Sequence, residues 1–542
     1  MKRAFWYDET HMDQQIAEVD TTEAHVVRFA KNYGNTSVTE NGAVGYRTTT
    51  KALLDLNFRV SSLRNRNESE IIEGYIKAFH ESPKYAVKWL FFLRDILEGM
   101  GERRTFRIGL KYLAISQPKI AQAILPFIPQ YGRFDDALVM LDTPLAADVA
   151  AFYKEQLDRD LEAMKCGEPI SLLAKWLPSI NTSSAKTREY AGKLCHHFKM
   201  SQKEYRRTLS RLRAYGNVVE TQMSAFRWAD IDYAKVPAKA NLKYDGAFAR
   251  HDLERRTEYL ESVLSGEGKL NAGGLMPYEI VHRFMKNAPS GAGLKDDLLA
   301  ELMWKKILAD GFANDWGLED AIVVADGSGS MFSFASGSSS VSAIEVCNSL
   351  AIYFAEQLKG VFHNKAITFS EHPQFIDLKD NTSLKDKMEI MFAHDEVANT
   401  NIEAVFNLIL DMAKSKDVPR EELPKQVLII SDMEFDWAVG NCDWYSRRRN
   451  TVNDTLFDRI AAEYEENGYR MPRLIFWNVC GRTDTIPKVD NEEGLCLLSG
   501  FSQNAMKVAA DPRKKDPYEA LLAVLDSPRY RTVGDAIKEY AA

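Results

Sequence analysis

Three small oxygen-bearing side chains follow one apolar run of this 542-residue chain at intervals of two residues. Asp326, Ser328 and Ser330 come directly after residues 321–325, whose composition is typical of a buried strand. The glycines between them let the backbone curl tightly. Mg²⁺ prefers oxygen ligands in near-octahedral geometry and keeps some positions for water or a partner. The loop therefore predicts a hard-cation site, and it favours a domain that binds over one that cuts.

Two later loops supply further oxygen atoms. Thr400 precedes a helical pattern, and Asp432 follows the strand-like run at residues 427–430. Together with the first loop they make two carboxylates and three hydroxyls, each at the end of a strand or helix. The alternative is a loop rich in serine and glycine that only caps the helix beginning near Ser340.

Catalytic interpretations of the first loop fail on residue identity. A nucleophile elbow has glycine two residues before and two after its serine, and Ser328 has Asp326 and Ser330 at those places. The chain contains no Gly-x-x-x-x-Gly-Lys-Ser/Thr phosphate loop. A metal-dependent nuclease would need more carboxylates than the two available. We therefore expect a protein that is not an enzyme.

Composition indicates a soluble globular protein of several domains, with 45% hydrophobic and 27% charged residues. No apolar run is long enough for a membrane span, and the N-terminus turns acidic where a signal peptide would turn apolar. The six cysteines are scattered without a Cys-x-x-Cys pair. That pattern argues against a zinc ribbon or a disulfide framework, and we expect a cytoplasmic monomer.

The periodicity of the apolar residues changes near residue 312. Residues 1–45 have weak periodicity and predict an N-terminal arm. Residues 46–312 show helical spacing between short turns, which favours an irregular α-solenoid of HEAT type. In residues 316–542, strand-like runs alternate with helices, a pattern that predicts a mostly parallel α/β sheet. Sites in such sheets lie at the carboxyl ends of strands, where the Asp326 loop is placed.

Charge is divided unevenly between these parts. Residues 1–310 hold 45 Lys+Arg against 40 Asp+Glu, whereas residues 311–542 hold 24 against 37. The densest basic stretch, residues 151–250, holds 18 against 11. A basic half is a pointer to a polyanion partner, and random drift of surface charge is the alternative.

The candidate contacts for such a polyanion are basic residues at helix faces and turns: Arg103, Arg104, Arg133, Lys175, Lys186, Arg188, Arg206, Arg207, Arg211 and Arg213. Arg207 and Arg211 stand one helical turn apart, where like charges repel, and a phosphate between them would relieve the repulsion. The alternative is a solvated face that pairs with acidic neighbours. Trp176 is a candidate for base stacking or for core packing. The pair His196–His197 lacks acidic or cysteine partners and predicts no metal site.

Several of these motifs resemble a known family. Asp326, Ser328, Ser330, Thr400 and Asp432 resemble the adhesion-site ligands of a von Willebrand factor A domain. The segment 496–502 resembles the Ser/Cys-Gly-Phe element near the end of that domain in Ro autoantigens. Residues 93–103 and 129–136 are similar to elements of the TROVE module, although Phe134 replaces a tryptophan and the loop at 333–340 is rich in serine.

The resemblance implies a ring of HEAT-like helices that is closed by the A domain, with Mg²⁺ at the adhesion site. It also implies binding of small non-coding, Y-like RNA on the outer helical surface and of misfolded RNA ends in the hole of the ring. A second reading remains open, in which the chain is a protein–protein adaptor whose metal captures a carboxylate of its partner.

Overall fold

The computed structural model divides the chain into a helical part and an α/β part. It describes residues 34–287, 293–312, 314, 316–318, 320–336, 340–369, 373–394, 402–415, 419, 423–435, 456–491 and 493–540. Among these residues, no helix is long and apolar enough to cross a membrane. The five cysteines that the structure describes are all free.

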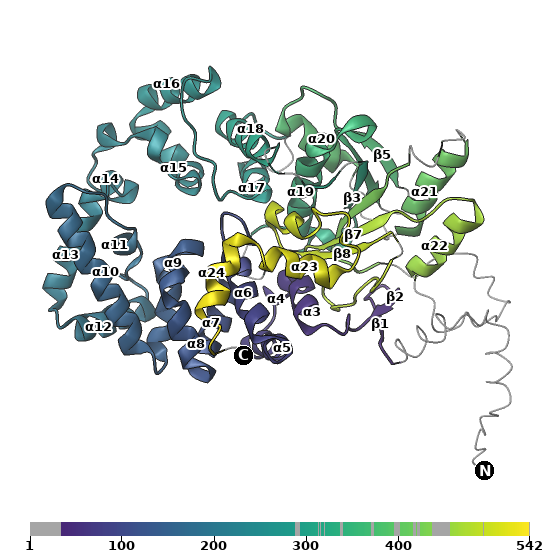
Figure 1. Ribbon diagram of the computed structural model, residues 1–542. Coiled ribbons are helices and arrows are strands. Elements are labelled where there is room, and N and C mark those ends of the chain that lie inside the picture. The colour runs from purple at the N-terminus through teal and green to yellow at the C-terminus, as the bar shows by residue number, and fades with distance from the viewer. Residues whose placement is uncertain are drawn as a thin grey trace, which may run out of the picture.

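The helical part is an arc of short helices that pack on their neighbours in chain order (Figure 1). The helices are α3 (Ala52–Phe58), α4 (Val60–Leu63), α5 (Glu68–Glu81), α6 (Pro83–Arg94), α7 (Arg104–Ser116), α8 (Pro118–Ile124), α9 (Ile128–Tyr131), α10 (Ala146–Cys166), α11 (Leu173–Trp176), α12 (Ala185–Phe198), α13 (Gln202–Tyr215), α14 (Val219–Ser224), α15 (Ala238–His251), α16 (Leu253–Leu264), α17 (Pro277–Asn287) and α18 (Leu298–Phe312). Four 3₁₀ segments join them: η1 (Leu125–Phe127), η2 (Phe134–Asp142), η3 (Trp228–Asp230) and η4 (Tyr233–Lys235).

Local sequence signals explain where these helices begin and end. Ser82 caps α6 ahead of Pro83, whose fixed φ suits the first helical position. Ser201 and Glu204 form a capping box at the start of α13. Gly167 ends α10 at φ +74°, a backbone conformation that glycine adopts without strain.

The α/β part contains a six-stranded sheet in the order β5-β4-β3-β6-β7-β8. Its strands are β3 (Ala321–Asp326), β4 (Lys365–Phe369), β5 (Gln374–Asp377), β6 (Gln426–Ser431), β7 (Arg473–Asn478) and β8 (Leu495–Ser499). All neighbours pair in parallel except β5, which runs antiparallel to β4. The apolar runs at residues 321–325 and 427–430, which the sequence marks as strands, lie in β3 and β6, whereas the antiparallel edge strand β5 has no counterpart in the sequence analysis.

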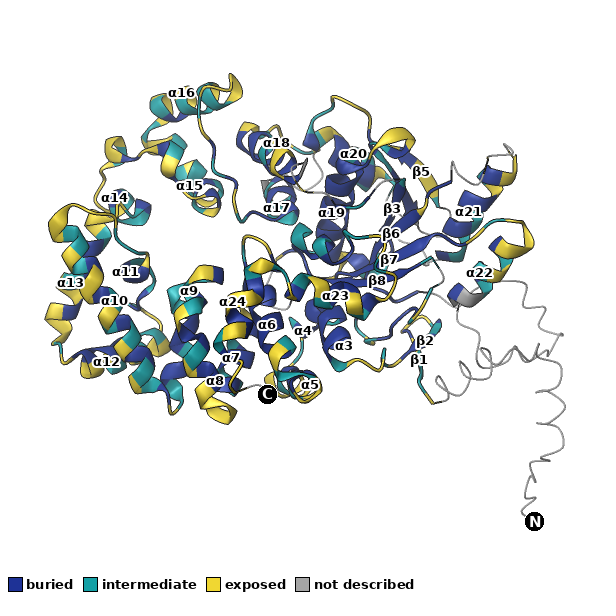
Figure 2. Ribbon diagram, viewed as in Figure 1, coloured by how far each residue is buried: buried dark blue, intermediate teal, exposed yellow. Residues whose placement is uncertain are grey.

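Helices cover this sheet on both sides (Figure 1). They are α19 (Ala343–Gln357), α20 (Leu384–Ala393), α21 (Ile402–Ser415), α22 (Leu456–Glu466), α23 (Pro517–Leu525) and α24 (Pro528–Ala536), with 3₁₀ turns η5 (Gly329–Phe332), η6 (Gly360–Phe362) and η8 (Gln503–Val508). Helix α19 contacts β3, β4 and β6, and α21 contacts β4 and α22. Every residue of β3, β6, β7 and β8 is buried (Figure 2), as expected for a parallel sheet covered by helices.

Both ends of the helical arc rest on the α/β part, so the molecule forms a closed ring of contacts. At one end α3 contacts β8, and α24 packs on α6 and α8. At the other end α17 contacts α19, and α18 contacts α19 and α20. Polar contacts reinforce both junctions: Arg529 Nε forms an ion pair with Asp95 Oδ2 at 2.6 Å, and His282 Nδ1 lies 3.1 Å from Glu345 Oε2. One hydrophobic core runs through both parts, which makes them a single packed unit.

Residues 34–46, which the sequence places in an arm ahead of the helices, contain a β-hairpin that packs on the α/β part. Its strands are β1 (Thr36–Val38) and β2 (Val44–Tyr46). The backbone of Tyr46 exchanges two hydrogen bonds of 2.8 Å with Ile486, and the Thr39 hydroxyl donates to the Phe435 carbonyl at 2.6 Å. The hairpin is therefore joined to the loops at the carboxyl ends of β6 and β7.

Candidate metal centre and nucleic-acid interface

The Asp326 loop lies at the carboxyl end of the central strand β3. The Asp326 side chain is fully buried and Ser328 is nearly so. The Ser328 backbone N–H donates to Asp326 Oδ1 at 2.9 Å. The Ser328 and Ser330 hydroxyl oxygens lie 3.0 Å apart. The three predicted metal ligands of this loop thus lie close to one another.

Strand β6 brings the second carboxylate to the same edge of the sheet. It runs parallel to β3 and ends at Ser431, whose hydroxyl donates to Asp326 Oδ2 at 2.6 Å. Asp432 follows, buried, with Oδ1 accepting the Glu434 N–H at 3.1 Å. Its Oδ2 accepts no hydrogen bond, and Arg482 Nη2 lies 3.4 Å from it. Met433 turns the chain here at φ +64°, a strained conformation typical of functional loops.

Electrostatics at this edge favour a bound cation. Burial raises the pKa of the Asp326 carboxyl, and the negative charge of Asp432 raises it further. Burial also raises the pKa of Asp432, against the opposing influence of the nearby Ser330 hydroxyl and Arg482. Two buried carboxylates side by side are costly unless a positive charge compensates them. Because Asp432 Oδ2 accepts no hydrogen bond, the negative charge of this carboxylate is only partly compensated.

The donor set fits a hard divalent cation. Asp326, Ser328, Ser330 and Asp432 offer only oxygen atoms, the ligands that Mg²⁺ prefers. Thr400, the fifth predicted ligand, lies outside the described residues. Among the residues that the structure describes, no three His, Cys, Asp or Glu side chains form a metal cluster, so a cation here would depend on hydroxyl groups and water beside its two carboxylates.

Sequence reasoning missed the side chains that support this site. Glu434 is buried and accepts the backbone N–H groups of Arg482 and Thr483 at 2.8 Å and that of Glu40 at 2.8 Å. Arg482 also pairs with Glu40 of the hairpin at 2.6 Å. Glu434 lies in the polar segment Ser431–Glu434 that directly follows a predicted strand, and this position could have identified it as a site residue. Nothing in the sequence pattern links Arg482 to Asp432, because they lie fifty residues apart.

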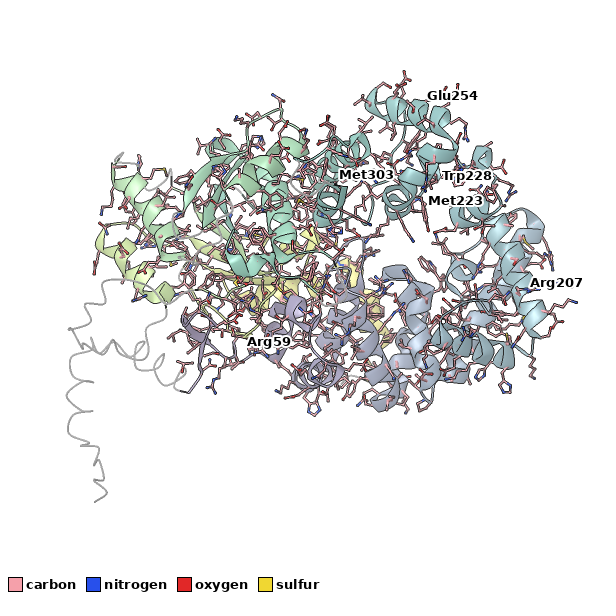
Figure 3. The ribbon with its side chains drawn as sticks, turned by 180° about the vertical axis from the view of Figure 1, so that it is seen from behind. Arg59, Arg207, Met223, Trp228, Glu254 and Met303 are labelled. Atoms are coloured by element: carbon pink, nitrogen blue, oxygen red, sulfur yellow. The ribbon has the colours of Figure 1, made fainter. Side chains whose placement is uncertain are left out.

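The predicted basic residues of α13 divide into two groups. Arg206, Arg207 and Arg211 are exposed, and none forms an ion pair or side-chain hydrogen bond with another described residue. Lys203, on the same helix, is equally exposed and unpaired within the described part of the chain. These four exposed cationic side chains of one helix are here called the α13 patch. Figure 3 places Arg207 on the outer margin of the arc.

Arg213, on the same helix, is held by hydrogen bonds to the segment at and after α11. Its Nε donates to the Ala174 carbonyl at 2.8 Å, its Nη1 to Ser179 Oγ at 2.9 Å and its Nη2 to the Leu177 carbonyl at 2.9 Å. Burial lowers the pKa of this guanidinium. Arg213 thus satisfies carbonyl groups at the end of α11, which a helix terminus leaves without partners.

We expect Arg213→Gln to lower the free energy of unfolding by about 2 kcal/mol, because two carbonyl groups would lose a charged donor. Urea denaturation measures the change. Arg211→Gln makes the same change at an exposed position of the same helix. Its free energy of unfolding should stay within about 0.5 kcal/mol of that of the unmodified protein. Equal losses in the two variants would contradict the assignment of Arg213 as a structural residue.

Three more predicted contacts already have partners. Arg104 donates to the Leu63 and Arg66 carbonyls at 3.0 and 2.9 Å. Arg188 donates to the Thr182 and Ser183 carbonyls at 2.6 and 2.8 Å. Lys186 pairs with Asp142 at 2.9 Å and with Glu189 at 3.1 Å. An RNA phosphate would have to compete with these bonds.

The remaining predicted residues form a second basic cluster around Trp176. The Arg133 guanidinium lies over the Trp176 ring at 3.7 Å from its centroid, and it also pairs with Asp135. Lys175 is 3.8 Å from Glu220. Burial lowers the pKa of the Arg103 guanidinium most, and the positive charges of Arg107 and Arg133 lower it further. A phosphate would have to compete with Asp135 and Glu220 for two of these three cations, whereas the stacked guanidinium and indole suit a base.

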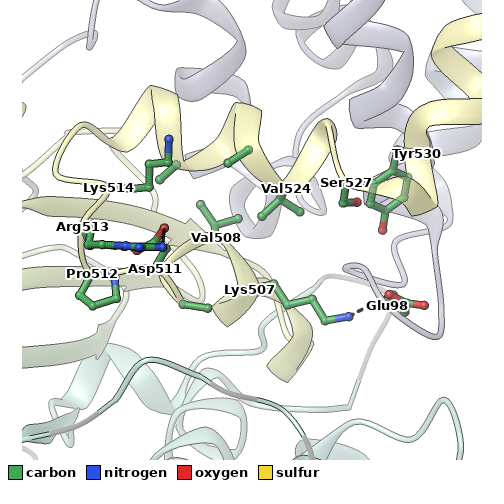
Figure 4. Close-up of a pocket in the computed structure, with 13 residues that line it drawn as sticks. Glu98, Lys507, Val508, Asp511, Pro512, Arg513, Lys514, Val524, Ser527 and Tyr530 are labelled. Atoms are coloured by element: carbon green, nitrogen blue, oxygen red, sulfur yellow. Dashed lines mark hydrogen bonds and ion pairs between the residues drawn. The ribbon is translucent and has the colours of Figure 1, made fainter.

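A cavity of about 620 Å³ lies between η8, α23 and α24 (Figure 4). Its floor is apolar, with Val508 and Val524, and its rim carries Lys507, Arg513 and Lys514. Lys507 pairs with Glu98 at 3.2 Å, and Arg513 pairs with Asp511 at 2.8 Å. Because these carboxylates neutralise two of the three cations, the α13 patch is the stronger candidate for a polyanion.

Two segments of the chain match family models that are described as domains of unknown function. Residues 320–527 match the family DUF7788, and residues 184–310 match DUF2828. Together they cover the sheet with the Asp326 loop and the helices that include α13. Uncharacterized protein L728 of Acanthamoeba polyphaga mimivirus is 27% identical over 528 residues, which cover 91% of this chain and 87% of that protein.

One solved structure is similar over much of the chain. The crystal structure of the Deinococcus radiodurans Ro (RSR) protein aligns with 83% of this chain and 92% of its own, with 13% identity and a TM-score of 0.41. The likeness is weak in both sequence and geometry.

Proposed function

We propose that this protein is a non-catalytic RNA-binding protein of Ro type, which binds small structured RNA on the outer face of its helical arc. The observation that carries the proposal is the α13 patch, where four cationic side chains of one helix are exposed without a carboxylate partner among the described residues. The motifs that resemble the TROVE module support the same conclusion.

The geometry of the α13 patch suits a phosphate backbone. Arg207 and Arg211 lie one turn apart on an exposed helix, where like charges repel in the free protein. A phosphate between them would turn that repulsion into attraction, and guanidinium groups can bind phosphate through two parallel hydrogen bonds. Binding of this kind reads shape and charge, as is typical for double-stranded RNA.

The cluster of Arg103, Arg133 and Trp176 is a second contact in this proposal. Its stacked guanidinium and indole suit an unpaired nucleotide, so it would receive the loose end of a misfolded RNA. Mg²⁺ is proposed at Asp326, Ser328, Ser330, Thr400 and Asp432, where it would compensate the buried carboxylates and brace the sheet that closes the ring.

A protein–protein adaptor is the second candidate, and one observation favours it. Phe332 and Phe334 are 48% and 64% exposed in the segment that directly follows the cation loop. Apolar rings beside a cation would suit a partner that offers a carboxylate next to apolar side chains. Partner capture that is lost on adding a chelator, and lost again with Asp326→Ala, would support this function. Capture that neither change affects would remove its mechanism.

The RNA proposal is tested by titrating the purified protein with a small structured RNA at low and moderate salt. We expect binding that weakens steeply as salt rises, because each neutralised phosphate releases counterions. The control is an unrelated acidic protein of similar size. Binding no tighter than that of the control would overturn the proposal.

A further inference from the structure

Arg482 brings a positive charge of the chain itself to the buried carboxylate pair. It follows β7 in the chain, and its side chain is 37% exposed. Its Nη2 lies 3.4 Å from Asp432 Oδ2, the oxygen that accepts no hydrogen bond. Arg482 therefore compensates the charge of Asp432 only in part, yet it lies close enough to repel a second positive charge at the same carboxylate.

Glu40 of the N-terminal hairpin binds the same guanidinium. It lies in the turn between β1 and β2, and its side chain is 58% exposed. Arg482 Nε donates to Glu40 Oε2 at 2.6 Å, a shorter contact than the one between Arg482 and Asp432. Two carboxylates thus compete for one guanidinium, and the geometry favours Glu40.

The buried Glu434 fixes the positions of both members of this ion pair. Its Oε1 accepts the Arg482 backbone N–H at 2.8 Å, and its Oε2 accepts the Glu40 backbone N–H at 2.8 Å. Asn41 Nδ2 donates to the Glu434 carbonyl at 2.6 Å, which adds a third bond between the hairpin and this segment. Glu434 lies two residues after Asp432, so buried hydrogen bonds join the hairpin and the Arg482 loop to the candidate cation site.

This arrangement opposes a cation at Asp432 to a degree that depends on Glu40. A divalent cation and a guanidinium at one buried carboxylate repel each other, because charges a few ångströms apart interact strongly where water is scarce. A guanidinium that pairs with Glu40 is held short of a hydrogen bond with Asp432 and repels less. If the Glu40 contact is lost, Asp432 Oδ2 can accept the guanidinium in its place.

We propose that Arg482 is a built-in competitor of the divalent cation, and that Glu40 of the hairpin sets how strongly it competes. The hairpin then tunes the affinity of a site that other segments build: attached, it draws Arg482 away from Asp432, and detached, it releases Arg482 to neutralise that carboxylate. The inference rests on the cation site of the proposed function and does not depend on RNA binding.

Titration calorimetry of the full chain with Mg²⁺ tests the role of Arg482. Arg482→Gln should bind Mg²⁺ at least about 10-fold more tightly than the unmodified protein, because it removes a like charge beside a ligand. Arg482→Met, a second uncharged variant, should match it, whereas Arg482→Lys should stay closer to the unmodified protein. The control is Arg470→Gln, which breaks another ion pair of the α/β part, with Glu493 at 3.3 Å, and should leave the affinity unchanged.

A double-mutant cycle tests the role of Glu40. Glu40→Gln alone should weaken Mg²⁺ binding by about 2- to 5-fold, the range for an exposed ion pair. In the Arg482→Gln background the same change should have no effect, because Glu40 acts through Arg482.

Two results would overturn the inference. One is that the uncharged Arg482 variants bind Mg²⁺ no more tightly than the unmodified protein. The other is that Glu40→Gln weakens binding equally in both backgrounds, which would mean that Glu40 acts on the cation directly. If neither the unmodified protein nor the Arg482 variants bind Mg²⁺, the cation site of the proposed function fails as well.

Discussion

Replacing Arg206, Arg207 and Arg211 together by glutamine is expected to weaken binding of a structured RNA by about 10- to 100-fold at moderate salt. The three side chains are exposed and have no carboxylate partners among the described residues, so each is free to neutralise a phosphate. The dependence of log affinity on log salt should become shallower by about 2 to 3, close to one counterion for each lost contact. A salt series with the variant and the unmodified protein measures both quantities.

The matched control removes the same charge from other faces of the ring. Lys84, Lys119 and Lys305 lie on α6, α8 and α18, each exposed and without an ion pair among the described residues. When all three lysines are replaced by glutamine, the slope of log affinity against log salt should differ by no more than about one from that of the unmodified protein. If both triple variants lose the same affinity, RNA binding follows net charge and the α13 patch has no special role.

Asp432→Asn is expected to have opposite effects on stability with and without a divalent cation. In the presence of a chelator it should stabilise the protein by about 1 kcal/mol, because it removes one of two adjacent buried carboxylates while keeping the oxygen that accepts the Glu434 N–H. With Mg²⁺ at a hundredfold excess over its Kd, the unmodified protein should gain about 2.7 kcal/mol and the variant should gain almost nothing.

Thermal melts of both proteins, with chelator and with a Mg²⁺ series, measure this crossover. Asp158→Asn changes a surface carboxylate on α10 that pairs only with Lys154 among the described residues, and it should leave the Mg²⁺ response intact. A melting temperature that does not respond to Mg²⁺, Mn²⁺ or Ca²⁺ in the unmodified protein would exclude a functional cation site at Asp326 and Asp432.

The sequence predicted the central features of the sheet because their signals are local. Apolar runs identified β3 and β6, and a polar residue directly after each buried strand identified Asp326 and Asp432. The parallel pairing of β3 and β6 then brought both carboxylates to one edge, as the order of loops implied. Fold class and carboxylate pair were therefore predictable without knowledge of tertiary contacts.

What the sequence could not predict depends on contacts between distant segments. Strand β5 is short and has only one buried position, so its apolar pattern is weak. Arg213 has the helical spacing of a surface residue, yet it binds carbonyl groups at the end of α11. The packing of α24 on α6 joins residues more than four hundred positions apart.

The most direct test of RNA binding is to sequence the RNA that co-purifies with the protein from cells that produce it, after crosslinking. The account predicts enrichment of small structured RNAs with the unmodified protein, and loss of most of that enrichment when Arg206, Arg207 and Arg211 are replaced by glutamine. Recovery of no RNA above the background of an unrelated acidic protein, or equal recovery by the two forms, would contradict it.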